Sequence, residues 1–143
     1  MANMTSWQTL GYLGLIPFVA VVMTTNSNTD IVGVSNYLIF SAYSACILSF
    51  LAGTLWLKHH NEQETAPTFL SNAFTLVAFA GLLLPPIFAL PLLAIGYLTL
   101  LASEFKLGLF TNKPEGYLLL RTVLTAIVVV CHLLMIINLP EQT

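Results

Sequence analysis

Five long apolar stretches separate the few charged residues of this sequence, and they restrict the folds that the chain can adopt. They run over residues 7–23, 37–57, 68–84, 87–105 and 117–139. Each is close to the roughly 17–25 residues that a helix needs to cross a membrane. Charged residues make up 7% of the chain, whereas about a quarter is usual in soluble domains. We therefore expect an all-α membrane protein, a compact bundle of five transmembrane helices that forms a single domain over residues 1–143.

The segment from Thr68 to Phe105 decides the number of crossings. As one helix, rising about 1.5 Å per residue, it would be nearly twice as long as the hydrocarbon core is thick. Pro85 and Pro86 interrupt this segment, and their rings disfavour a helix that continues through them. We therefore expect the chain to turn back at the proline pair. By the same reasoning, Pro17 predicts a kink in the first helix.

The basic residues predict how the bundle is oriented. With five crossings, all Lys and Arg residues of the chain fall on one side of the membrane, namely Lys58, Lys106, Lys113 and Arg121. Four crossings, with the proline pair inside one oblique helix, would divide them between both sides. Because basic residues collect in cytoplasmic loops, the sequence favours five crossings, with the N-terminus inside and the C-terminus outside.

Small residues recur at every fourth position of the second stretch, at Ser41, Ala45, Ser49 and Gly53. Such positions share one face of a helix, so they predict a helix-packing stripe that another backbone can approach closely. A large side chain on this stripe, as in Gly53→Leu, should then disturb the bundle more than Leu48→Ala does. Contact within the bundle is the expected role, and a homodimer interface is the alternative.

His132 lies deep in the fifth stretch, and ionisable groups inside a membrane are candidates for a functional site. A neutral histidine that bonds a serine or a backbone carbonyl is the structural alternative. Cys46 and Cys131 are expected at a similar depth, so the three residues form a candidate intramembrane polar site. Two thiols and an imidazole suit a soft metal, but their positions lack the spacing of a metal motif. We therefore expect neither a metal nor another cofactor.

Arg121 lies one turn into the last stretch, close to the expected membrane surface. Long basic side chains in this position extend toward the interface. We expect Arg121 to contact a lipid headgroup, and an ion pair with Glu104 or Glu115 is the alternative.

The outer hairpin, residues 82–92, contains three prolines and no polar side chain. A turn at a membrane surface is ordinarily in contact with water, so an apolar turn suggests that another protein covers it. The expected contact residues are Pro85, Pro86, Phe88 and Leu90. Burial in the lipid interface is the alternative.

Several function classes have no support in the sequence. The apolar stretches contain no Ser-His-Asp arrangement, phosphate-binding loop or pair of carboxylates suited to acid–base chemistry. The net charge of −2 and the lack of a basic run argue against nucleic acid as a partner. We therefore expect a protein that is not an enzyme.

Three segments resemble a known family: GYLGLIPFVA at Gly11–Ala20, YSACILSFLAGTLW at Tyr43–Trp56 and LLLPP at Leu82–Pro86. They are similar to a domain-of-unknown-function family of small proteobacterial inner-membrane proteins. Its eukaryotic relatives include the mitochondrial transmembrane protein sixty-nine. The resemblance covers most of the chain and implies a location in the bacterial inner membrane, but it brings no known activity.

Taken together, these features predict an accessory or assembly subunit of a larger membrane complex. The small size, the stripe of small residues and the apolar hairpin favour this function, and the mitochondrial relatives suggest a respiratory complex. The partners would be membrane lipids and that complex. The alternative is a small transporter or ligand-binding bundle with a site near His132, although transporters usually contain more buried polar residues.

Overall fold

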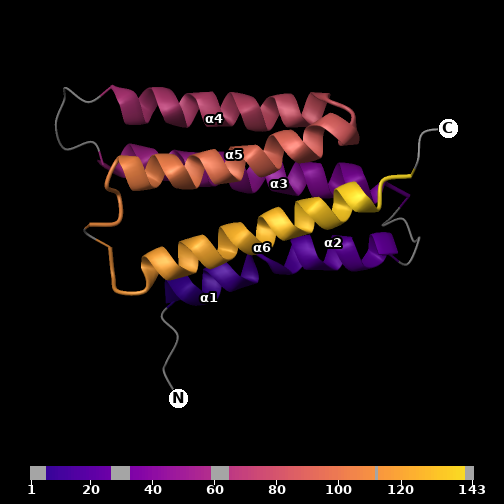
Figure 1. Ribbon diagram of the computed structural model, residues 1–143, viewed down its shortest axis with the longest axis horizontal. Coiled ribbons are helices and arrows are strands. Elements are labelled where there is room, and N and C mark those ends of the chain that lie inside the picture. Colours follow the sequence, from indigo (N-terminus) through magenta and orange to yellow (C-terminus); the bar gives the residue numbers. More distant parts are fainter. Residues whose placement is uncertain (1–5, 27–32, 59–64, 112, 141–143) are drawn as a thin grey trace, which may run out of the picture.

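The structure, a computed structural model, describes residues 6–26, 33–58, 65–111 and 113–140. Within these ranges the regular elements are helical (Figure 1): α1 (Ser6–Leu13), α2 (Ile16–Asn26), α3 (Asn36–Gly53), the 3-10 helix η1 (Thr54–Lys58), α4 (Ala66–Leu83), α5 (Pro86–Lys106) and α6 (Tyr117–Ile137). Five helical segments are long and apolar enough to cross a membrane, with α1 and α2 forming one of them. The predicted all-helical fold is therefore confirmed.

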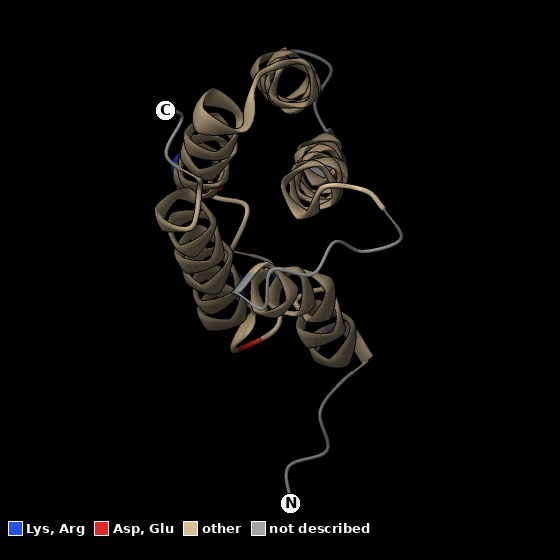
Figure 2. Cartoon of the chain, turned by 90° about the vertical axis from the view of Figure 1, so that its right-hand side faces the viewer, with Lys and Arg blue, Asp and Glu red and all other residues tan. Residues whose placement is uncertain are grey.

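The helices run back and forth beside one another along the long axis of the molecule (Figure 1). α3 packs against α2, α4 and α5, while α6 packs against α5, α2 and α1. The end of α3 and the start of α4 lie at the same end of the bundle as the end of α5 and the start of α6, and the turn between α4 and α5 lies at the other end. Figure 2 views the bundle from the end with this turn, and the helices there carry few acidic or basic residues.

The proline pair ends one helix and begins the next, as the sequence predicts. α4 ends at Leu83 and α5 begins at Pro86. Between them, Leu84 and Pro85 are extended, both with ψ of 150°. Pro86 stands at the first position of α5, where its missing N–H group costs no helical hydrogen bond.

The first crossing is interrupted rather than kinked. One continuous helix bent at Pro17 was the expectation, but α1 ends at Leu13 and α2 begins at Ile16. Pro17 has no N–H group to donate to the carbonyl of Leu13, and its ring would clash with that carbonyl, so the helix breaks one turn before the proline. In the break, the amide of Leu15 donates to the carbonyl of Tyr12 over 3.0 Å.

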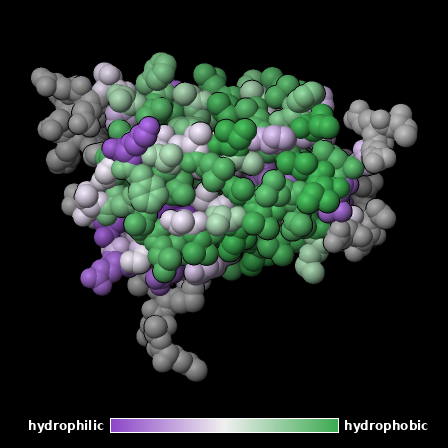
Figure 3. Space-filling view, viewed as in Figure 1, coloured by the Kyte–Doolittle hydropathy of each residue, from purple (hydrophilic) through white to green (hydrophobic). Residues whose placement is uncertain are grey.

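Apolar side chains both fill the bundle and cover its outside. The fully buried side chains include those of Leu48, Leu93, Leu100 and Met135, which come from three different helices. Large apolar side chains are also exposed along every crossing, and they cover most of the face shown in Figure 3. Polar residues gather on this face near the end with the connection from α5 to α6. An apolar outside suits lipid as the surrounding solvent.

Close helix contacts occur at other glycines than the one in the small-residue stripe. A Cβ atom at Gly96 would lie 2.8 Å from Cδ2 of Leu48, and one at Gly81 would lie 2.9 Å from Cδ2 of Leu93. At Gly53, no described atom lies within 4 Å of that position. The expectation of a close contact within the bundle at Gly53 is therefore wrong, because this residue lies exposed at the end of α3.

The rest of the stripe turns gradually away from the bundle. Ser41 and Ala45 are buried, whereas Ser49 is half-buried. Residues four apart advance by 400° on a helix, so a strict four-residue repeat drifts by about 40° per step around the helix. The drift explains why only the first half of the stripe is buried inside the bundle.

Candidate functional site

A buried ion pair joins α5 to α6. Nη2 of Arg121 donates to Oε1 of Glu104 over 2.8 Å, and the two side chains are only 7% and 4% exposed. Nη1 of Arg121 also donates to Oγ1 of Thr125, over 3.4 Å. Arg121 therefore points into the bundle, and its expected contact with a lipid headgroup is wrong. The alternative partner Glu104 is the one it binds, while Glu115 is exposed.

The geometry of α6 explains the inward direction of Arg121. Arg121, Thr125, Val128 and His132 follow one another at intervals of four, three and four residues, so they share one face of the helix. All four are buried. A guanidinium on this face reaches the Glu104 carboxylate before it reaches the surface, and an uncompensated charge there would be costly.

The pair keeps unused hydrogen-bonding capacity. Nε of Arg121 and Oε2 of Glu104 are buried, and neither has a hydrogen-bond partner among the described residues. Buried polar atoms in native proteins nearly always have a partner, either a protein atom or an ordered water molecule. The Arg121–Glu104 pair therefore has room for one more polar contact.

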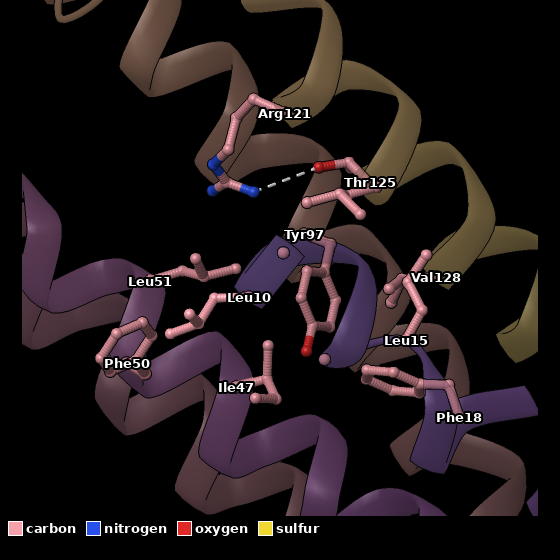
Figure 4. Close-up of a pocket in the computed structure, with 13 residues that line it drawn as sticks. Leu10, Leu15, Phe18, Ile47, Phe50, Leu51, Tyr97, Arg121, Thr125 and Val128 are labelled. Carbon is pink, nitrogen blue, oxygen red and sulfur yellow. Dashed lines mark hydrogen bonds between the residues drawn. The ribbon is translucent and has the colours of Figure 1, made fainter. Parts of the chain in front are cut away.

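A groove with a volume of about 140 Å³ lies beside this pair, between α1, α2, α3, α5 and α6. Figure 4 shows Arg121 and Thr125 at one end of the groove and the Tyr97 ring within it. Leu10 and Phe50 also line it, and they are 70% and 72% exposed. We call this space the lateral groove, because its exposed rim belongs to the apolar side of the bundle and its floor is buried.

The break between α1 and α2 lies at the wall of the lateral groove, where Gly14 and Leu15 line it. Gly11 and Gly14 line it and have no side chains that would fill it. α1 packs on α6, where Gly11 faces Leu120 and Leu124. The Tyr43 hydroxyl of α3 donates to the carbonyl of Gly14 over 2.9 Å and holds the break in place. The space remains between α1 and α3.

His132 belongs to a buried hydrogen-bond network that adjoins the groove through Tyr97 and Val128. Its Nδ1 lies 2.8 Å from the carbonyl of Val128, which can only accept, so Nδ1 carries a hydrogen. Its Nε2 then accepts from the Ser44 hydroxyl, 2.9 Å away. The Tyr97 hydroxyl in turn donates to the Ser44 carbonyl over 2.7 Å. His132 is thus a neutral histidine that joins α6 to α3, and it does not line the groove.

The structure does not bring His132, Cys46 and Cys131 together as one site. Cys131 is buried, but Cys46 is exposed on the outside of α3. Among the described residues, no group of three or more His, Cys, Asp or Glu side chains could hold a metal ion. The expectation that these three residues share a site is therefore wrong, because similar depth does not place residues on facing sides of their helices.

The hairpin residues divide between the outside and the core. Phe88 is 62% exposed, Pro85 is exposed and Pro86 is half-buried. Leu90 is fully buried, so its expected role in partner contact is wrong. Two residues apart on a helix, Phe88 and Leu90 point to nearly opposite sides.

Sequence reasoning missed Tyr97 and Thr125, which line the groove. A serine was an expected partner of a neutral His132, and Ser44 is that partner. The four- and three-residue spacing from Arg121 to His132 was a readable signal for one polar face of α6. For Ser44 and Tyr97, no sequence pattern indicates which helix lies opposite.

Comparison with known proteins identifies a family. A family model described as "Protein of unknown function (DUF3429)" matches residues 4–137, and the chain belongs to that family. Neither the curated proteins nor the solved structures contain a match.

Proposed function

We propose that this protein is a multi-pass membrane protein, not an enzyme, that binds a small apolar molecule in the lateral groove. The observation that carries this proposal is the groove itself, about 140 Å³ in volume, which ends at Arg121 and Thr125. Sites for small molecules typically combine apolar walls with a few polar groups that fix orientation. This is the ligand-binding bundle that the sequence left as the alternative, with the site near Arg121 instead of His132.

The size and the exposure of the groove support a ligand from the membrane. A dry cavity of about 150 Å³ in another protein holds one benzene ring, so the groove has room for a group of similar size. The exposed rim residues Leu10 and Phe50 belong to helices that are apolar enough to cross a membrane. A ligand dissolved in lipid would therefore enter sideways, without passing through water.

Purification from native membranes in mild detergent, followed by mass spectrometry of bound small molecules, tests the proposal. Ile47 lines the groove, so Ile47→Trp should fill it and remove the bound molecule. Ile95→Trp is the matched control, because Ile95 is exposed on α5 and lies outside the groove. A bound molecule that survives Ile47→Trp, or its absence from the wild-type protein, would contradict groove binding.

An accessory or assembly role in a larger membrane complex is a second candidate. The observation that favours it is the exposed hairpin, where Leu84, Pro85, Ile87 and Phe88 form an apolar end of the bundle. The resemblance to mitochondrial relatives suggests a respiratory complex as the partner. The two candidates are compatible, because the hairpin and the groove use different residues.

The proposed location is the bacterial inner membrane, with the N-terminus in the cytoplasm and the C-terminus outside. Support comes from η1, the end of α5 and the start of α6, which lie at the same end of the bundle and carry or adjoin all four basic residues. A reporter that is active only in the cytoplasm should be active within residues 61–66 and silent after residue 143. A reporter that is silent within residues 61–66 and active after residue 143 would contradict this orientation.

A further inference from the structure

We call the end of the lateral groove at the buried residues Arg121 and Thr125 its closed end. The polar side chains there offer hydrogen-bond donors. Arg121 has donors only, and its Nε has no partner among the described residues. Thr125 accepts from Arg121, which leaves its own hydrogen to donate. Thr75 and Thr122 donate to the carbonyl four residues earlier, but Thr125 makes no such bond in the described structure. A ligand with a hydrogen-bond acceptor therefore finds donors at this end.

The charge of the closed end is already balanced. Glu104 lies 2.8 Å from Arg121, so the pair is neutral as a whole. No other charged side chain lines the groove among the described residues. An anionic ligand would add a third charge to a buried, apolar site without a free counter-charge, and its loss of hydration would oppose binding. The site is therefore suited to an uncharged acceptor such as a carbonyl oxygen.

The walls and the opening restrict the rest of the ligand. Phe18, Phe50 and Tyr97 line the groove and offer aromatic faces, against which flat rings pack well. The volume of about 140 Å³ has room for one ring. Any longer part of the ligand must leave through the exposed rim beside Leu10 and Phe50, where an apolar tail would lie in the lipid.

From these features we infer that the lateral groove binds a quinone-type molecule, an uncharged single ring with carbonyl oxygens and an apolar tail. The carbonyl oxygen accepts from the Thr125 hydroxyl, the ring packs among the aromatic side chains, and the tail extends into the membrane. This inference rests on the proposed groove binding and adds the chemical class of the ligand.

Binding of three matched probes to the intact protein in nanodiscs of neutral lipid tests the inference. The probes are 2-decyl-1,4-benzoquinone, 4-decylbenzoate and decylbenzene, which share a ring and a ten-carbon tail but differ in their polar group. Affinity is measured from the shift in thermal unfolding as each probe is titrated. 2-Decyl-1,4-benzoquinone should bind about five- to tenfold more tightly than decylbenzene, because one neutral hydrogen bond contributes up to about that factor, and more tightly than 4-decylbenzoate, whose charge opposes binding.

Variants of Thr125 separate recognition from folding. Thr125→Val should weaken binding of 2-decyl-1,4-benzoquinone about five- to tenfold and leave binding of decylbenzene unchanged, whereas Thr125→Ser, which keeps the hydroxyl, should retain the affinity. Thr122→Val is the matched control on the same helix, because Thr122 is exposed and its hydroxyl donates to the carbonyl of Leu118.

Each outcome bears on a different claim. Tighter binding of 4-decylbenzoate, or equal affinity for all three probes, would overturn the quinone inference while groove binding stands. An equal effect of Thr122→Val and Thr125→Val would also overturn it. If none of the probes binds, the inference and the proposed function fall together.

Discussion

The guanidinium of Arg121 and the carboxylate of Glu104 lie 2.8 Å apart inside the bundle and join α6 to α5. Breaking a buried ion pair by removing one partner typically costs about 3–5 kcal/mol, because the remaining charge is left without compensation. We expect this cost for Arg121→Met in the free energy of unfolding, measured by denaturant titration in micelles. The double variant Arg121→Met with Glu104→Leu should lose much less. Lys106→Met, an exposed basic residue of α5, is the control and should have little effect.

A double variant that is less stable than Arg121→Met would contradict this explanation. It would mean that each side chain stabilises the bundle through other contacts, and that the ion pair does not account for the loss of stability.

The hydrogen bond between Ser44 and His132 should stabilise the bundle. Ser44→Ala leaves Nε2 of His132 without its donor, and a lost buried hydrogen bond costs about 1–3 kcal/mol. Ser49→Ala on the same helix is the control, because Ser49 is only half-buried. Neither change should alter binding of the molecule in the lateral groove, which His132 does not line. Loss of that binding in Ser44→Ala, with unchanged stability, would return His132 to the candidate site.

The close contact between Gly96 and Leu48 should be sensitive to added bulk. Gly96→Val should cost about 1–3 kcal/mol in the free energy of unfolding, because the new side chain overlaps Leu48. Gly53→Val should cost less, since no described atom lies near the added side chain. Leu48→Ala should cost about 2–5 kcal/mol, because Leu48 is fully buried. The small-residue stripe predicts the opposite order, with more destabilisation from bulk at Gly53 than from Leu48→Ala. A larger loss of stability in Gly53→Val than in Leu48→Ala would support the stripe as a contact face.

Two variants of the hairpin, Phe88→Ser and Leu90→Ser, form a matched pair that tests the accessory role. Phe88→Ser should release the protein from a native complex without unfolding it, because Phe88 is 62% exposed. Leu90→Ser should instead reduce the stability of the bundle, because Leu90 is fully buried. Native gels in several mild detergents, together with thermal unfolding, separate the two effects. Migration of the wild-type protein alone in all of them would exclude a stable complex.

The arrangement along the chain was largely predictable, because length and proline chemistry act locally. The break at Pro85 and Pro86 follows from the missing donors and from the thickness of a membrane. Pro17 predicted a disturbance in the first crossing, but the full interruption also depends on Gly14, which follows α1, and on Tyr43, a residue of another helix.

The site was less predictable, because it depends on which helices face one another. Arg121 has the position of a residue that extends to the lipid surface, and only the packing of α5 against α6 places Glu104 beside it. Packing separates Cys46 from His132 in the same way. Their expected depths agree, but Cys46 is exposed and His132 is buried. Depth follows from sequence position, whereas direction follows from tertiary contacts.

Photolabelling tests most directly whether the lateral groove binds molecules from the membrane. The protein in nanodiscs would be labelled with an aryl diazirine that carries a decyl tail, and the labelled residues mapped by mass spectrometry. Groove binding predicts saturable labelling at Leu15, Ile47 and Leu124, which line the groove, with little saturable labelling at the exposed Ile95 and Ile137. Labelling spread evenly over all exposed apolar residues, unchanged by an excess of unlabelled decylbenzene, would contradict a binding site in the groove.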